Sequence, residues 1–174
     1  MDGRRARRQL DQIAEVLRLA GDLGIGLWLR GGWAMDFFLG EVTRDHADID
    51  WFTWSDTAET LAGALLGHGY APVPGPPPEL QLDFAKDGLD SSFTLLTGDA
   101  AGQVLVAGGP WAGTAWPEGM LDGAPGRIGT LRCAIVNPRV QIEIKRMMPV
   151  WDPALPRRAK DAADIARLEA ALGS

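Results

Sequence analysis

The sequence of 174 residues contains one cysteine, Cys133, and two histidines, and these shortages exclude several kinds of protein. One thiol cannot form an intramolecular disulfide framework or a zinc site built from several cysteines. The sequence also lacks a run of about 18 apolar residues, which a membrane-spanning helix needs. Its first twelve residues are basic and polar, and no apolar segment follows them, so no secretory signal is expected. The sequence therefore predicts a soluble, cytoplasmic protein that has no membrane partner.

Positive charge is also in short supply, because 17 Lys and Arg stand against 23 Asp and Glu and give a formal net charge of −6. Proteins that bind the phosphate backbone of nucleic acids usually show the opposite balance, so we expect no nucleic-acid partner. Hydrophobic residues make up 46% of the chain, enough for one core at this length. We expect a single domain over 1–174, with a core at about 22–137 and a C-terminal helical segment at about 138–174.

Hydrophobic periodicity predicts helices that alternate with strands. Apolar residues three to four positions apart indicate helices at 5–21, 33–39, 57–67 and 159–172. Apolar or alternating runs indicate strands at 25–29, 48–53, 80–84, 89–96 and 131–136, with a hairpin turn at 86–88. Residues 140–147 fit a helix or a strand, 72–78 form a stiff proline-rich loop, and 98–127 give no clear assignment. Since regular βαβ spacing is missing, the pattern favours an α+β fold with a mixed sheet.

Two aspartates, Asp48 and Asp50, open the predicted strand at 48–53. Residues i and i+2 of a strand point to the same face, which places these carboxylates about 6.5–7 Å apart at the backbone. Such a pair can hold a hard cation, or it can simply be solvated. The pair Gly31-Gly32 precedes a predicted helix, where a ligand can approach the backbone and free N–H groups favour an anion. An ordinary turn between strand and helix is the alternative.

Three further side chains are candidate phosphate contacts. Arg44 can bind two phosphate oxygens at once. His46 is a phosphate contact, a zinc ligand or a structural loop residue. Lys145 either contacts phosphate from the C-terminal half or is a solvated residue near a helix end. With the glycine pair and the two aspartates, Arg44 and His46 indicate a site for phosphate and metal.

Residues 26–53 resemble the small aminoglycoside and lincosamide nucleotidyltransferases of the DNA polymerase β-type superfamily. The shared residues are Leu27-Trp28, Gly31-Gly32-Trp33-Ala34, Asp36, Leu39-Gly40, Val42-Thr43-Arg44, His46 and Asp48-Ile49-Asp50. Lys160-Asp161 and Asp164 fit the family more loosely. The resemblance implies a nucleotidyltransferase fold, a mixed β-sheet flanked by helices, with a small C-terminal helical part.

The same resemblance implies a chemistry and roles for residues. Asp48 and Asp50 would hold two Mg²⁺ ions that bind ATP or another nucleoside triphosphate, while Gly31, Gly32, Arg44, His46 and Lys145 would contact the nucleotide. A third carboxylate on a neighbouring strand would complete the site and act as general base. Asp90 matches its position, and Asp83 on the preceding strand is the alternative. The implied reaction transfers a nucleoside monophosphate, AMP from ATP, to a hydroxyl of a small molecule such as an aminoglycoside or lincosamide antibiotic.

Some departures from the family pattern leave alternatives open. Ser91 and Ser92 follow Asp90 where the aminoglycoside enzymes carry further acidic residues, so the acceptor class stays open. Arg30 replaces a small or acidic residue and either contacts phosphate or lies on the surface. The other functions are a minimal nucleotidyltransferase that acts on or binds a protein, as in toxin–antitoxin pairs, and a non-catalytic nucleotide-binding module. Because the C-terminal part is short, the acceptor pocket is shallow, open, or completed by the second subunit of a homodimer.

Overall fold

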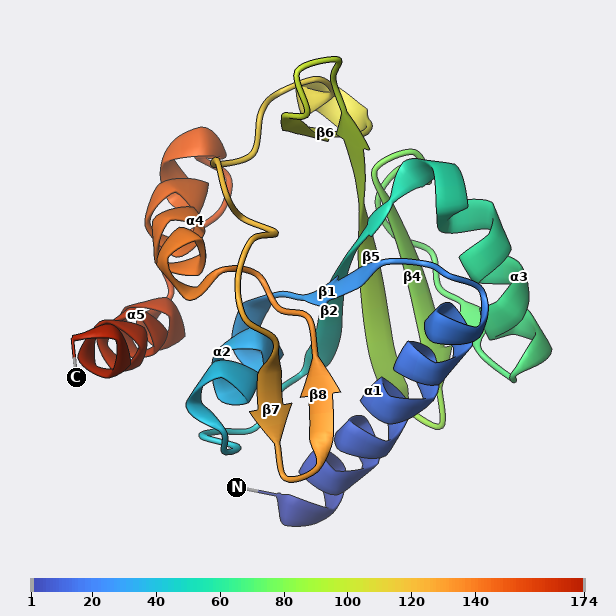
Figure 1. The fold of residues 1–174 in the computed structure, drawn as a ribbon, viewed down its shortest axis with the longest axis horizontal. Coiled ribbons are helices and arrows are strands. Elements are labelled where there is room, and N and C mark those ends of the chain that lie inside the picture. The colour runs from blue at the N-terminus through green and yellow to red at the C-terminus, as the bar shows by residue number, and fades with distance from the viewer. Residues whose placement is uncertain (1, 174) are drawn as a thin grey trace.

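The computed structural model describes residues 2–173 and confirms the α+β class (Figure 1). One mixed sheet has the strand order β1-β2-β5-β4-β3, with β6 paired to the end of β5, and β7 and β8 form a separate hairpin beside α2. The strands are β1 (Leu27–Leu29), β2 (Asp48–Trp54), β3 (Ala71–Pro72), β4 (Gln81–Lys86), β5 (Leu89–Gly98), β6 (Val104–Val106), β7 (Gly126–Ile128) and β8 (Leu131–Cys133). The α-helices are α1 (Gly3–Asp22), α2 (Gly31–Leu39), α3 (Ala58–Gly67), α4 (Pro138–Trp151) and α5 (Ala159–Leu172).

The two central strands, β2 and β5, run parallel, and their register pairs Asp48 with Asp90. The other pairs in the sheet are antiparallel. The predicted hairpin between β4 and β5 is confirmed: its turn uses Asp87 and Gly88 with φ angles of 53° and 73°, a conformation that suits aspartate and glycine. The register therefore brings the start of β5 beside the start of β2.

One face of the sheet is covered by α1 and α3 (Figure 1). Alternation along β2 and β5 turns Ile49, Trp51 and Phe93 to this face, where they pack with Ile13 of α1 and Leu61 of α3. All five side chains are fully buried. Burial of an apolar side chain of this size stabilises the fold by roughly 1.5–3 kcal/mol, so this layer is the main core and fixes the register of β2.

The opposite face of the sheet is apolar at one end of the strands and carries carboxylates at the other. Phe52 of β2 and Leu96 of β5 are buried against Val140 and Ile144 of α4. The same face nearer the start of β2 carries Asp48 and Asp50, and alternation in β5 gives this face Asp90 and Ser92. Because α4 covers only the apolar part of this face, the carboxylates are left facing a space bordered by helices.

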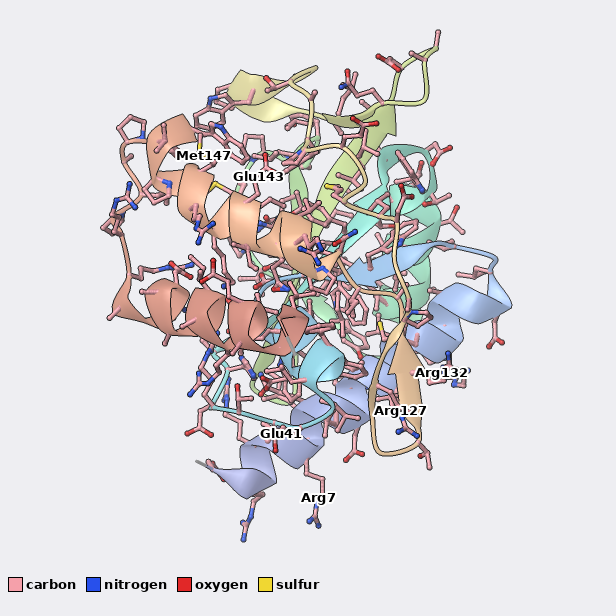
Figure 2. The ribbon with its side chains drawn as sticks, turned by 60° about the vertical axis from the view of Figure 1, so that its left-hand side comes forward. Arg7, Glu41, Arg127, Arg132, Glu143 and Met147 are labelled. Carbon is pink, nitrogen blue, oxygen red and sulfur yellow. The ribbon has the colours of Figure 1, made fainter. Side chains whose placement is uncertain are left out.

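The segment that fits either a helix or a strand belongs to α4. Pro138 occupies its first turn, and the side chain of Asn137 caps it by accepting a hydrogen bond from the backbone N–H of Arg139. Figure 2 shows α4 and α5 lying side by side, with Glu143 on the exposed side of α4.

Residues 98–127 hold β6, a short 3₁₀ turn at Gly109–Trp111 and the start of the β7–β8 hairpin. Within residues 2–173, no helix combines the length and the hydropathy that crossing a bilayer requires.

Candidate active site

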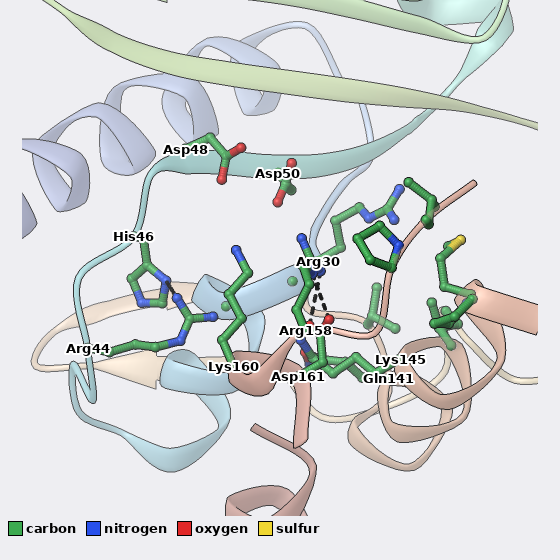
Figure 3. Close-up of a pocket in the computed structure, with 18 of the residues that line it drawn as sticks. Arg30, Arg44, His46, Asp48, Asp50, Gln141, Lys145, Arg158, Lys160 and Asp161 are labelled. Atoms are coloured by element: carbon green, nitrogen blue, oxygen red, sulfur yellow. Dashed lines mark hydrogen bonds and ion pairs between the residues drawn. The ribbon is translucent and has the colours of Figure 1, made fainter. Parts of the chain in front are cut away.

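A cavity of about 330 Å³ lies between the start of β2, the N-terminus of α2 and the helices α4 and α5 (Figure 3). Its lining combines five basic side chains with three carboxylates, although the whole chain carries a net charge of −6. The bases are Arg30, Arg44, Lys145, Arg158 and Lys160, and the acids are Asp48, Asp50 and Asp161. Positive charge is therefore concentrated in this cavity, as binding of a polyphosphate requires.

Asp48 and Asp50 point from β2 into the cavity, toward the side where α5 begins (Figure 3). Asp48 is exposed, whereas Asp50 is partly buried. Burial raises the pKa of Asp50 above its usual value, the charge of Arg30 opposes that rise, and the neighbouring charge of Asp48 adds to it. The site thus holds a carboxylate whose negative charge is poorly compensated within the protein.

The N-terminus of α2 faces these carboxylates through Gly31 and Gly32. Gly31 has φ +66°, in the left-handed region that glycine adopts without strain, and a Cβ atom there would lie 3.0 Å from Asp50 Oδ2. A Cβ atom at Gly32 would lie 2.6 Å from Arg44 Nη2 and closer still to His46. The first turn of α2 contains no acidic residue, and no side chain caps it. Its free N–H groups therefore remain available to an anion.

Arg44 and His46 form one hydrogen-bonded unit beside Gly32. Arg44 Nη1 lies 3.0 Å from His46 Nδ1, and His46 Nε2 lies 2.6 Å from Asp36 Oδ2. Because a guanidinium only donates, His46 Nδ1 accepts, and the ring N–H at Nε2 donates to Asp36. Both ring nitrogens are then engaged, which leaves none for zinc. His46 is 4% exposed and holds Arg44 in place.

The lysine predicted as a phosphate contact, Lys145, reaches the cavity from α4. Its Nζ lies 3.0 Å from Asp164 Oδ2 and 3.4 Å from Asp161 Oδ1. Asp164 also accepts two hydrogen bonds from Arg44, at 3.1 and 2.8 Å. The carboxylates of α5 thereby gather Arg44 and Lys145, two predicted phosphate contacts that lie about a hundred residues apart in sequence.

Two further cations line the cavity, Arg158, which sequence reasoning missed, and Lys160, to which it gave no role at the site. Arg158 Nε donates to Asp161 at 2.7 Å. Lys160 forms no hydrogen bond or ion pair with any residue in the described part of the chain, and Figure 3 shows its ammonium group directed toward Asp48. The loose family match at Lys160-Asp161 and Asp164 was the signal that could have placed these side chains at the site.

Arg30 lies inside the cavity and not on the surface. Its guanidinium stands over the ring of Phe52 at 4.4 Å and donates to Thr94 Oγ1 at 2.9 Å. Burial lowers the pKa of Arg30, while the charges of Asp50 and Asp48 oppose that shift. The sequence pattern could not reveal this position, because residue 30 follows β1 directly and its direction depends on how β1 pairs with β2.

The two candidates for the third carboxylate occupy different strands. Asp90 stands next to Asp48 in the β2–β5 register and is exposed. Asp83 lies one strand farther away, pairs with Ser92 across β4 and β5, and accepts a hydrogen bond from Gln81 at 2.8 Å. Neither residue lines the cavity. Asp90 is therefore the candidate that lies nearer Asp48 and has no competing hydrogen bond within residues 2–173.

The oxygen donors of the site suit a hard divalent cation. The poorly compensated carboxylate of Asp50, with Asp48 on the same face of β2, offers the oxygen ligands that Mg²⁺ prefers. No cluster of three or more His, Cys, Asp or Glu side chains arranged to hold a metal occurs among residues 2–173. Two carboxylates still fit Mg²⁺, because this ion is commonly bound by one or two carboxylates together with substrate phosphates.

Sequence comparison relates the chain to enzymes that modify aminoglycosides. The 2″-aminoglycoside nucleotidyltransferases of Klebsiella pneumoniae and Escherichia coli are 48% identical to it over 42 residues. That segment covers 24% of this chain and 24% of each relative, so the match spans about a quarter of their length.

Solved structures share the fold over most of the chain. ANT(2″)-Ia in complex with adenylyl-2″-tobramycin aligns with a TM-score of 0.73 at 20% identity, covering 95% of this chain and 90% of that one. The lincomycin-bound lincosamide adenylyltransferase LnuA aligns with a TM-score of 0.73 at 16% identity, covering 91% of this chain and 95% of that one. These similarities confirm the predicted nucleotidyltransferase fold.

A family model extends the relationship beyond the short segment of high identity. The model of the aminoglycoside-2″-adenylyltransferase family matches residues 12–116, which is more than half of the chain. The matched range includes Gly31-Gly32, Asp48, Asp50 and Asp90. The chain therefore belongs to the aminoglycoside-2″-adenylyltransferase family of nucleotidyltransferases.

Proposed function

We propose that this protein transfers a nucleoside monophosphate, AMP from ATP, to a hydroxyl group of a small antibiotic-type acceptor. The observation that carries the proposal is the cavity in which Asp48 and Asp50 face a cluster of cations beside the free N-terminus of α2. A nucleoside triphosphate offers the phosphates for those cations and N–H groups. Adenylyl transfer is supported by the family and by the adenylylated tobramycin in the ANT(2″)-Ia complex.

Each group of residues has a separate task in this reaction. Asp48 and Asp50 would hold Mg²⁺, which when bound neutralises charge on the phosphate oxygens. Arg44, Lys145 and Lys160 would bind and orient the phosphates. The acceptor oxygen attacks the α-phosphorus, the bond from that phosphorus to the bridging oxygen breaks, and pyrophosphate leaves. The carboxylate of Asp90 would take the proton of the attacking hydroxyl.

The acceptor is proposed as an aminoglycoside or a lincosamide because solved relatives of the same fold are complexes with both classes. The comparisons favour neither a protein acceptor nor a non-catalytic module. The start of the β2–β5 face, where the exposed Asp90 lies beside Asp48 and the half-buried Ser92 lies beside Asp50, offers the acceptor hydroxyl a place next to the nucleotide cavity.

Pyrophosphate release tests the reaction directly. We expect wild-type protein with Mg²⁺ and ATP to release pyrophosphate only when an aminoglycoside or lincosamide is added, and Asp48→Ala to lose that release. Because Asp48 is exposed, the variant should keep the wild-type thermal unfolding midpoint. Nucleotide binding without release for any small acceptor in the panel would contradict the proposed acceptor class. Failure to bind any nucleoside triphosphate would contradict the enzyme itself.

Paired variants identify the general base. We expect Asp90→Asn to lower kcat by about 10²–10⁴-fold, the range for removal of a positioned general base, and Asp83→Asn to change it by less than about threefold. The two aspartates lie on adjacent strands, so each variant controls for loss of a carboxylate in the hairpin. Single-turnover rates with saturating ATP would measure the effect. A larger loss in Asp83→Asn would transfer the role to that residue.

A further inference from the structure

Gln141 is a buried polar residue of the cavity to which the proposed reaction assigns no role. Its side chain lines the cavity from α4 and the residue is only 3% exposed. Neither Oε1 nor Nε2 has a hydrogen-bond partner among residues 2–173, and no other residue lining the cavity has a buried polar side-chain atom left unpaired. A buried amide without partners costs free energy, so a ligand that pairs with both atoms would recover it.

The face of α4 that carries Gln141 borders both a charged and an apolar part of the cavity. Gln141, Ile144, Lys145 and Met148 follow helical spacing and present one face of α4 to the cavity. Lys145 belongs to the charged part described above. The apolar part is lined by Phe52, Val136, Ile144, Met148, Leu155 and Pro156. A nucleotide has the same division into anionic phosphates and a flat base whose two faces are apolar.

The apolar part of the cavity also contains a flat stacked pair. The guanidinium of Arg30 lies 4.4 Å from the centre of the Phe52 ring, and both side chains line the cavity. Phe52 is fully buried, so a base would stack on the guanidinium of Arg30. Nucleobases stack on guanidinium planes, and proteins then recognise them by hydrogen bonds to their polar edges. An amide is suited to such an edge, because it donates and accepts side by side.

We propose that Gln141 selects the nucleobase of the donor nucleotide by pairing its amide with the polar edge of the base. The inference rests on the proposed function, since it assigns a residue to the same nucleotide site. For adenine, Oε1 accepts from the 6-amino group and Nε2 donates to the adjacent ring nitrogen. Glutamate at this position only accepts, so it cannot serve that ring nitrogen. It matches guanine, whose N1–H and 2-amino groups both donate.

The test compares ATP with GTP in wild type and in three variants. In Gln141→Glu, we expect the ratio of kcat/KM for GTP to that for ATP to rise about tenfold or more. In Gln141→Met, which keeps the length of the side chain and removes the amide, we expect kcat/KM for ATP to fall by about tenfold through KM. The control Gln12→Met removes another buried glutamine amide, on α1 and outside the cavity, and should change neither value.

Calorimetric binding of ATP and GTP gives a readout that does not depend on catalysis, and thermal unfolding checks each variant. If Gln141→Glu does not fold, Gln141→Met decides the question. An unchanged GTP-to-ATP ratio in folded Gln141→Glu would overturn the inference. A raised KM for the antibiotic with unchanged nucleotide constants would also overturn it, because Gln141 would then belong to the acceptor site. Wild-type protein that binds no nucleotide would instead overturn the proposed function.

Discussion

Replacement of Asp50 by asparagine is expected to lower nucleotidyl transfer by roughly 10³-fold or more while raising the thermal unfolding midpoint. The loss of activity follows because bound metal contributes several kcal/mol to stabilisation of the transition state, and the amide is a poor ligand. The gain in stability follows from the raised pKa of Asp50. A carboxyl whose pKa is higher in the folded than in the unfolded protein destabilises the fold once it is ionised, so its removal helps at neutral pH.

Misfolding would lower both the activity and the unfolding midpoint, so a variant with lower activity and a higher midpoint is not simply misfolded. Unfolding should be followed by calorimetry at pH 5 and pH 8, where the advantage of Asp50→Asn should be larger at pH 8. MgATP should raise the midpoint of wild type but not that of the variant, because ligand that binds only the folded state stabilises it. Asp56→Asn, at an exposed aspartate just after β2, is the control. A less stable Asp50→Asn would show that the carboxylate is already compensated within the protein.

The parts of the fold that the sequence predicted are those with a local cause. Alternation in β2 placed Ile49 and Trp51 in the core and therefore Asp48 and Asp50 on the other face. The hairpin between β4 and β5 followed from Asp87 and Gly88, whose backbone needs positive φ. The helix α2 began two residues earlier than predicted, at Gly31, because the glycine pair is part of its first turn and not a turn ahead of it.

The parts that escaped prediction depend on pairing between distant segments. Arg44 reaches Asp164, 120 residues later, and no local spacing encodes that contact. The spacing of apolar residues predicts which face of a helix is buried, but it does not predict which element packs against that face. The position of Lys145 beside α5 could therefore not be predicted. In 98–127, Trp116 packs edge-on against Phe52 at 5.1 Å, which fixes an irregular segment that has no periodic pattern.

The place of Gln141 in the cavity could not be predicted from the sequence either. Residues 140–147 alternate like a strand, and the sequence left helix and strand open. The cap by Asn137 and the proline at 138 decide for the helix, and only then does Gln141 come one turn before Lys145 on the face that lines the cavity. The sequence therefore indicated the carboxylates of β2 and, on α4, Lys145, but it gave no sign of Gln141.

Replacement of Asp164 by asparagine is expected to lower both the stability of the protein and its binding of ATP. Asp164 is fully buried and accepts hydrogen bonds from Arg44 and Lys145, while α5 packs on α2 and α4 through Leu168. Asp164→Asn removes the negative charge and leaves two cations close together. Loss of one partner from a buried ion pair costs about 3–5 kcal/mol, and each 1 kcal/mol corresponds to roughly 2–4 °C at this chain length. We expect the unfolding midpoint to fall by about 10 °C, and ATP binding to weaken because Arg44 is released.

The pH dependence gives this prediction a second, independent measure. Burial alone would raise the pKa of Asp164, but the hydrogen bonds from Arg44 and the charge of Lys145 outweigh it and lower the pKa. A carboxyl with a lowered pKa stabilises the fold above its unfolded value of about 3.9, and that stabilisation is lost as the pH falls through the folded value. In urea unfolding, wild type should therefore lose stability below about pH 4, and Asp164→Asn should lose less.

Glu143→Gln, on the exposed side of α4, should keep the wild-type profile. Equal acid profiles for wild type and Asp164→Asn would mean that Arg44 and Lys145 are held in the cavity by other contacts, and ATP binding by the variant should then be unimpaired.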